Sequence, residues 1–202
     1  MHVSSNTKSG FSLVETLVAI TILLLVIIGP LTISSSSIRG TAFASEQVVA
    51  FFLAQEGAEL AQKARDEFVL ENLKNSATRP NPWADFINQN GSLRLCYSAS
   101  GCNLLVNTDT AGSLSTPRSC SGQDACLMYL DTGATQNRSR YNSNSVGQRT
   151  PFARKIKLQT IVAGGQINEV RVESIVTWRS GFSREEQQVV VQTSLFNVYG
   201  TN

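Results

Sequence analysis

The side chains that could perform covalent or metal chemistry are few in this sequence. Four cysteines form two pairs of equal spacing, Cys96 with Cys102 and Cys120 with Cys126, and His2 is the one histidine. Zinc sites favour two to four residues between paired cysteines, so disulfides in an oxidising compartment suit this pattern better. Three connectivities are open. We expect the neighbouring pairs, because nearby cysteines close first, and free buried thiols are the alternative.

Composition excludes several classes of function. The chain has 202 residues and a net charge of +2, which argues against a nucleic-acid binder that works by bulk charge. An apolar share of 42% argues against wholesale disorder. Because no nucleophile motif, metal-ligand cluster or cofactor motif is present, we expect a protein that is not an enzyme and that needs no cofactor or metal.

An apolar run near the N-terminus is the most informative segment. Residues 11–33 read FSLVETLVAITILLLVIIGPLTI and contain one ionisable side chain, that of Glu15. As a helix they would span about 34 Å, enough for a hydrocarbon core of about 30 Å. The run is too long for a secretory signal, and the small residue Gly10 precedes it instead of following it. A plain membrane anchor fits the length but leaves Glu15 unexplained, because a carboxylate is costly in lipid.

Residues 8–19, KSGFSLVETLVA, resemble the processing motif of type IV prepilins and of the pseudopilins of type II secretion. In that family a prepilin peptidase cuts after the glycine, on the cytoplasmic side, and methylates the new N-terminal residue. The resemblance implies cleavage between Gly10 and Phe11, N-methylation of Phe11 and a role in assembly for Glu15. His2 would leave with the leader, and the mature chain would contain no imidazole for a catalytic triad.

The position of Glu15 leaves three interpretations open. A cut after Gly10 frees an amine with a pKa of about 7.7–8.0, and Glu15 lies about one helical turn beyond it. The carboxylate can face its own N-terminus, where the helix dipole favours an anion. It can instead pair with the Phe11 amine of a neighbouring subunit, as the resemblance implies. The third interpretation places it among lipid headgroups without a role.

Gly29 and Pro30 fall inside the apolar run. Proline removes a helix hydrogen bond, so we expect a kink or a local opening of the helix here. Pilins often carry a proline at about this depth. The alternative is a proline that a membrane helix simply tolerates.

The rest of the chain predicts an α+β fold, in which a long N-terminal transmembrane and stalk helix packs on a small C-terminal antiparallel sheet. We divide the whole chain into a leader (1–10), a transmembrane part (11–33), an amphipathic stalk (34–75) and a globular headpiece (76–202). Val49, Phe52, Leu53, Leu60 and Ala64 fall on one apolar stripe of the stalk. Glu56 interrupts this stripe, either to pair with a neighbour's cation or, as we prefer, to reach solvent.

The C-terminal third predicts an antiparallel β-meander over residues 153–199, with turns at Gly164-Gly165 and Ser180-Gly181. Residues 91–150 are expected to form loops with short strands, and a mobile loop is expected over 132–148. The segments 126–131, 152–156, 176–178 and 195–197 also resemble the headpiece of PilV-type minor pilins.

These observations favour a minor pilin-like subunit, trimmed at Gly10 and assembled into a type IV pilus or a secretion pseudopilus. The expected partners are prepilin peptidase, other pilin or pseudopilin subunits, an inner-membrane assembly platform and membrane lipid, with no specific nucleic acid. The headpiece would be extracytoplasmic, first on a single-pass membrane protein and then on a surface or periplasmic filament. The alternative is a single-pass anchored surface or sensor domain that never polymerises.

Overall fold

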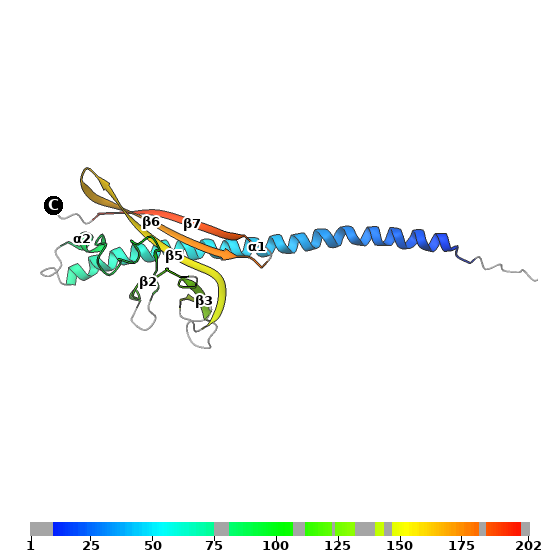
Figure 1. The fold of residues 1–202 in the computed structure, drawn as a ribbon, viewed down its shortest axis with the longest axis horizontal. Helices are drawn as coiled ribbons and strands as arrows, with labels where there is room; N and C mark the ends of the chain where they lie inside the picture. Colours follow the sequence, from blue (N-terminus) through cyan, green and yellow to red (C-terminus); the bar gives the residue numbers. More distant parts are fainter. Residues whose placement is uncertain are drawn as a thin grey trace, which may run out of the picture. The chain divides into compact units, whose positions relative to one another are not determined.

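The computed structural model describes residues 10–74, 81–106, 112–122, 124–131, 140–143, 147–181 and 185–198. The chain divides into two compact units, Met1–Ala44 and Ser45–Asn202. One long helix, α1 (Leu13–Lys74), contributes residues to both units (Figure 1). The leader before Gly10 and the expected boundary between stalk and headpiece at 75–76 lie outside the described residues.

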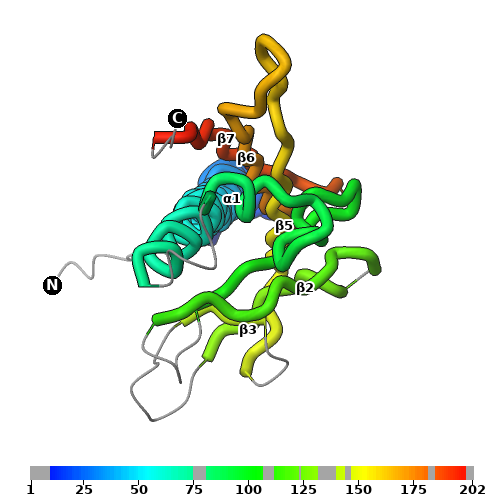
Figure 2. The backbone as a smooth tube through the Cα atoms, turned by 90° about the vertical axis from the view of Figure 1, so that its left-hand side faces the viewer, coloured from blue at the N-terminus to red at the C-terminus, as the bar shows by residue number. Residues whose placement is uncertain are grey.

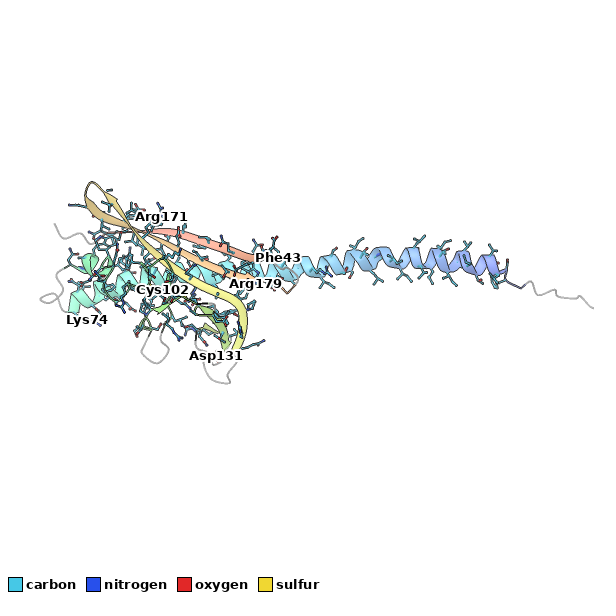
Figure 3. All side chains as sticks on the ribbon, in the orientation of Figure 1. Phe43, Lys74, Cys102, Asp131, Arg171 and Arg179 are labelled. Atoms are coloured by element: carbon cyan, nitrogen blue, oxygen red, sulfur yellow. A yellow bond between two sulfur atoms is a disulfide. The ribbon has the colours of Figure 1, made fainter. Side chains whose placement is uncertain are left out.

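The first unit contains the apolar part of α1. Its large apolar side chains project on every side of the helix (Figure 3), and the most apolar stretch has no buried residue. By length and composition α1 can cross a membrane, and it is the one helix of the described residues that can. Hydroxyl groups in this stretch donate to the helix's own carbonyls, as Thr16 does to Leu13 and Thr21 to Val18. Polar side chains satisfied in this way are tolerated in lipid.

In its described residues the second unit contains the remainder of α1, a short helix and seven strands in one antiparallel sheet. The short helix is α2 (Pro82–Phe86). The strands are β1 (Cys102–Asn103), β2 (Arg118–Ser119), β3 (Leu127–Asp131), β4 (Arg140–Asn142), β5 (Gln148–Ala163), β6 (Gln166–Arg179) and β7 (Glu186–Phe196). The strands lie around one side of the 45–74 segment of α1 (Figure 2).

β5 is the central strand of this sheet. One of its edges pairs with β6 from Ala153 to Ala163, and its other edge pairs first with β3 and then with β1. β6 pairs with β7 along the whole of β7. Gly164 and Gly165 join β5 to β6 with φ angles of 61° and 81°. A two-residue turn of this kind needs positive φ at both positions, which glycine adopts at no steric cost.

Two buried clusters fill the space between α1 and the sheet. Alternate residues of β5 and β6 point into them, as the period-2 pattern predicts. The first cluster includes Leu60, Ala61 and Ala64 of α1 with Ile156, Leu158, Val170 and Val172. The second includes Ala50, Leu53 and Ala54 with Met128, Phe152, Val176 and Trp178.

The face of α1 that meets the sheet is built mainly of small residues. Its buried members are Ala50, Leu53, Ala54, Gly57, Ala58, Leu60, Ala61 and Ala64. At Gly57 a Cβ atom would collide with the Oγ of Ser174 and lie 3.1 Å from Cδ of Arg154. The glycine therefore permits a close approach of helix to sheet. The predicted stripe is wrong at Phe52, whose side chain is 63% exposed.

The expected α+β fold and the C-terminal meander are confirmed. Asn81 caps α2 by accepting a hydrogen bond from the Ala84 N–H at 3.0 Å, and Pro82 is its first helical residue. The expectation of a loop over 132–148 is wrong where Arg140–Asn142 forms β4 and Gln148 begins β5. Of the other positions in 132–148, the structure describes residues 143 and 147, and the remainder lie outside the described residues.

Candidate functional site

The expected cleavage site lies just before α1. Gly10 and Phe11 precede the first helical residue, Leu13, and Phe11 is 83% exposed. No atom lies within 4 Å of the position that a Cβ on Gly10 would take. A protease could therefore reach the bond between these residues without unfolding any described element.

Glu15 lies in the first turn of α1 and is exposed. The carbonyl of Ser12 accepts hydrogen bonds from the N–H groups of Glu15 at 3.0 Å and Thr16 at 3.2 Å, so the helix is ordered from its first turn. A carboxylate at this end of a helix is favoured by the backbone dipole. The arrangement leaves the Glu15 carboxylate available to an amine near the helix start, of its own chain or of another. The choice between these two partners stays a prediction.

α1 is helical through Gly29 and Pro30. The Oγ1 of Thr32 donates to the Gly29 carbonyl at 2.7 Å. Pro30 has no N–H to give to the carbonyl one turn earlier, so the helix is weakened here. A bend or an opening at this point stays a prediction.

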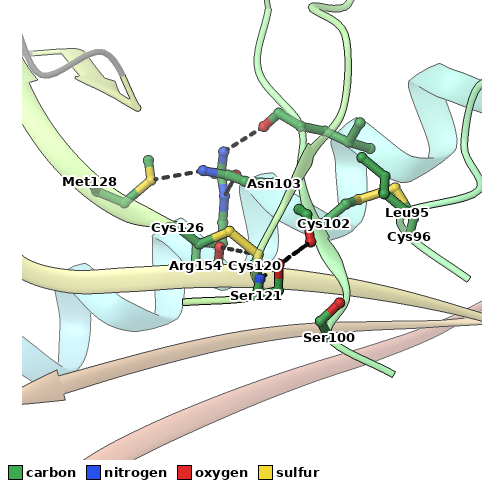
Figure 4. Close-up of a disulfide and its surroundings, with 12 residues drawn as sticks. Leu95, Cys96, Ser100, Cys102, Asn103, Cys120, Ser121, Cys126, Met128 and Arg154 are labelled. Atoms are coloured by element: carbon green, nitrogen blue, oxygen red, sulfur yellow. Dashed lines mark hydrogen bonds between the residues drawn. A yellow bond between two sulfur atoms is a disulfide. The ribbon is translucent and has the colours of Figure 1, made fainter. Parts of the chain in front are cut away.

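The four cysteines form two disulfides, Cys96–Cys102 and Cys120–Cys126, with Cα–Cα distances of 4.5 Å and 5.2 Å. None of the four is a free thiol. Both bridged loops attach to the same edge of β5. Cys96 accepts from the N–H of Leu158, and Cys126 accepts from the N–H of Arg154. The disulfides therefore hold two irregular segments against the central strand (Figure 4).

A buried arginine lies between these two attachments. The side chain of Arg154 is 0% exposed, and its three nitrogen atoms donate to acceptors on two other segments of the chain. Figure 4 shows its hydrogen bond to Asn103. On α1 the acceptors are Oε2 of Glu56 at 2.7 Å and the carbonyl of Leu53 at 3.3 Å. In and after β1 they are Oδ1 of Asn103 at 3.3 Å and the carbonyl of Leu104 at 2.8 Å. Arg154 thus joins β5, α1 and the segment that follows Cys102.

The electrostatics of this cluster explain why Arg154 is paired with Glu56. Burial lowers the pKa of the Arg154 guanidinium, while the charge of Glu56 and its hydrogen bond act in the opposite direction. A fully desolvated cation needs a counter-charge and acceptors for its N–H groups. The expectation that Glu56 reaches solvent without a partner is therefore wrong, although its side chain stays 40% exposed.

Sequence analysis missed Arg154, yet a signal was present. Phe152, Ile156 and Leu158 alternate toward the core, and Arg154 occupies the same phase of β5. The arrangement around it positions segments and has no reacting group. The described residues also contain no group of three or more histidine, cysteine or acidic side chains that could hold a metal ion.

Comparison with protein families identifies the N-terminal segment. Residues 5–29 match the family model of the prokaryotic N-terminal methylation motif, which is the signature of type IV prepilins. The motif supports a type IV pilin-like protein that prepilin peptidase processes, and with the apolar helix it indicates a single-pass membrane anchor. Comparisons with curated proteins and with solved structures found no match to the chain.

Proposed function

We propose that this chain is a structural subunit, of the minor kind, of a type IV pilus or a type II secretion-like pseudopilus. One observation carries the proposal: the methylation motif at 5–29 leads directly into a helix whose apolar side chains are exposed all round. Such a helix is stable in lipid or among other apolar helices. Before assembly the helix would be surrounded by membrane lipid. In the filament it would be surrounded by the helices of other pilin or pseudopilin subunits.

The proposed processing follows the motif. Prepilin peptidase removes residues 1–10 and methylates the amine of Phe11. Residues 11–33 then anchor the chain, 34–75 form the stalk and 76–202 form the headpiece. During assembly at an inner-membrane platform, Glu15 pairs with the Phe11 amine of a neighbouring subunit. The exposure of Glu15 and its place in the first turn of α1 support this pairing.

Two observations support an extracytoplasmic headpiece with a structural role. Disulfides persist in oxidising compartments, and the structure contains two of them. The headpiece builds one sheet on a helix around a buried positioning arginine. Its irregular segments 91–101 and 112–117 and the segments that resemble PilV-type headpieces favour a minor over a major subunit.

The test is incorporation of Glu15 variants into filaments. Glu15→Leu deletes the one charge of the apolar run, so membrane insertion should hold or improve, while incorporation should fall because a neighbour's amine loses its counter-charge. Glu15→Gln is the matched control that keeps the shape and removes the charge. Surface filaments are sheared from cells, and the subunit is quantified by immunoblot in the sheared and membrane fractions.

Opposite movement of the two fractions supports a filament subunit. For a non-polymerising surface or sensor domain, the membrane level would hold and no wild-type chain would reach the sheared fraction. Equal recovery of wild type and both variants in sheared filaments, at equal membrane levels, would show that Glu15 is not an assembly residue.

A further inference from the structure

The outer edge of β7 has no role in the function proposed above. Within the part of the chain that the structure describes, β7 pairs with β6 and with no other strand. A free edge presents a row of backbone N–H and C=O groups that can template another strand. Natural proteins usually block such edges with short strands, charges, prolines or bulges.

β7 carries one of these protections, the charge of its first residue, Glu186, and lacks the others. It is 11 residues long, whereas β2 and β4, at the other end of the sheet, have two and three residues. Residues 187–198 contain no charge and no proline. The pairing of β6 with β7 is regular, although the register of β5 shifts against both β3 and β6. Beyond Glu186, the edge of β7 is therefore unpaired among the described residues, uncharged and regular.

The sequence of β7 is nearly symmetrical about Val190. Residues 188–192 read QVVVQ. If two copies of β7 pair antiparallel with Val190 opposite Val190, Val189 meets Val191 and Gln188 meets Gln192. Glu186 then meets Ser194, so no like charges face each other.

The two faces of β7 also match in this pairing. Val190 is 42% exposed on the outer face of the sheet, together with Gln188 and Gln192. Val189 and Val191 point the other way and pack against the cluster that contains Trp178. Opposite residues of an antiparallel pair share a face. The apolar face of one copy would therefore continue that of the other.

We propose that β7 is a self-association edge, which pairs antiparallel with β7 of a second copy of this chain about Val190. In the second unit β7 runs alongside α1 and toward its Lys74 end (Figure 1). The 45–74 segments of two paired copies therefore run in opposite directions. The pairing does not rest on the proposed function.

The experiment traps the pair with a disulfide across the two-fold axis. Opposite Cα atoms in an antiparallel pair are about 4.5–5.5 Å apart, which suits a disulfide. All four native cysteines are already bonded, so one added cysteine reports alone. Full-length Val190→Cys in mild detergent is oxidised and run on a non-reducing gel. Val162→Cys, on β5, is the control. Residue 162 is 64% exposed, so it would crosslink more readily than residue 190 if random collisions formed the disulfide.

We expect the crosslinked homodimer from Val190→Cys at ten-fold or more the yield from Val162→Cys. Differently tagged Val190→Lys and Val190→Glu chains should capture each other, while neither captures its own kind. Intact native disulfides in each variant show that it is folded. Equal yields at positions 190 and 162, or a crosslink to a different protein when the variant is expressed in cells, would overturn the proposal. Because the detergent assay involves no filament, its failure would leave the filament function standing.

Discussion

Nη1 of Arg154 lies 2.7 Å from Oε2 of Glu56, and this contact joins the central strand of the sheet to the long helix. The two residues are 98 positions apart in the chain. The cation is fully buried, while the carboxylate keeps 40% exposure. This asymmetry decides how the pair responds to substitution, because only the arginine is cut off from water.

Glu56→Gln should lower the free energy of unfolding by about 1–3 kcal/mol. Losing one partner of a fully buried pair costs about 3–5 kcal/mol, and the exposure of Glu56 reduces that figure. Arg154→Met should also destabilise the fold, since Asn103 and the Leu104 carbonyl lose their donor. Urea unfolding of the full chain in mild detergent, followed by the fluorescence of the buried Trp83 and Trp178, measures both effects.

The matched control for this pair is Glu59→Gln, on the exposed side of the same helix, which should change stability by less than about 0.5 kcal/mol. Combining Glu56→Gln with Arg154→Met should cost less than the sum of the two single losses. Strict additivity would mean that the two side chains do not interact in solution.

Alkaline pH should destabilise the second unit through Tyr97. The phenol donates to the Phe86 carbonyl at 3.0 Å, and burial raises the pKa of Tyr97 above its ordinary value. The unfolded chain therefore loses the proton first, at about pH 10. Stability is fully present below that pH and falls above it, by up to about 1.4 kcal/mol per pH unit for one group.

Burial also raises the pKa of Tyr141, so this residue adds to the same loss. Tyr97→Phe should flatten the dependence above pH 10 at a cost of about 1 kcal/mol near neutral pH, and adding Tyr141→Phe should flatten it further. Urea midpoints between pH 8 and 11 test this. If stability falls with pH as steeply in the double variant as in wild type, other groups cause the loss.

The two disulfides should differ in their contribution to stability. Each closes a loop of seven residues, worth about 2.4 kcal/mol in the chain-entropy model. Cys96 and Cys102 are fully buried in the first core cluster, whereas Cys120 is half-buried. Replacing the first pair by alanine should therefore cost about 1 kcal/mol more than replacing Cys120 and Cys126, because it also leaves a cavity. Thermal unfolding of the two double variants compares them, and the reverse order would show that the second loop holds the sheet more tightly.

Two charged residues depart from the apolar patterns around them, and their contact in the folded structure accounts for both. Glu56 interrupts an apolar stripe of α1, and Arg154 occupies a buried phase of β5. Alternation alone would have placed Arg154 in the core, and a buried cation then requires an acidic partner nearby. Which acid it is depends on the packing of α1 against β5, and no local pattern contains that information.

The face of α1 shows a different limit of sequence patterns. Hydrophobicity favours Phe52 as a core residue, but the helix turns its alanines and Gly57 to the sheet and leaves Phe52 exposed. Close approach of helix to sheet at Gly57 outweighs the burial of one aromatic ring. Strong local signals, by contrast, predicted the Gly164-Gly165 turn and the meander correctly.

Processing should yield a mature chain of 192 residues that begins at N-methyl-Phe11, the remainder of the 202 after ten are removed. Gly10→Val should block the cut, because a β-branched side chain crowds the protease at the scissile bond. Gly40→Val is a matched control, since neither glycine has a neighbour within 4 Å of its Cβ position. N-terminal mass spectrometry of the native protein decides. An intact Met1 in wild type, or a cut within residues 34–37, would contradict the assignment.

Gly57→Ala should destabilise the second unit even though alanine is the better helix former by about 1 kcal/mol. The new Cβ would collide with the Oγ of Ser174, and overpacking of this kind typically costs about 1–3 kcal/mol. The Oγ of Ser174 is buried and has no hydrogen-bond partner among the described residues, so Ser174→Ala alone should be neutral or stabilising. The double variant should then recover part of the loss, although Cδ of Arg154 stays 3.1 Å from the new methyl group. Urea midpoints of the three variants test this. A double variant no more stable than Gly57→Ala would locate the clash at Cδ of Arg154 or at the Cβ atom of residue 174, which lies 3.2 Å from the new methyl group.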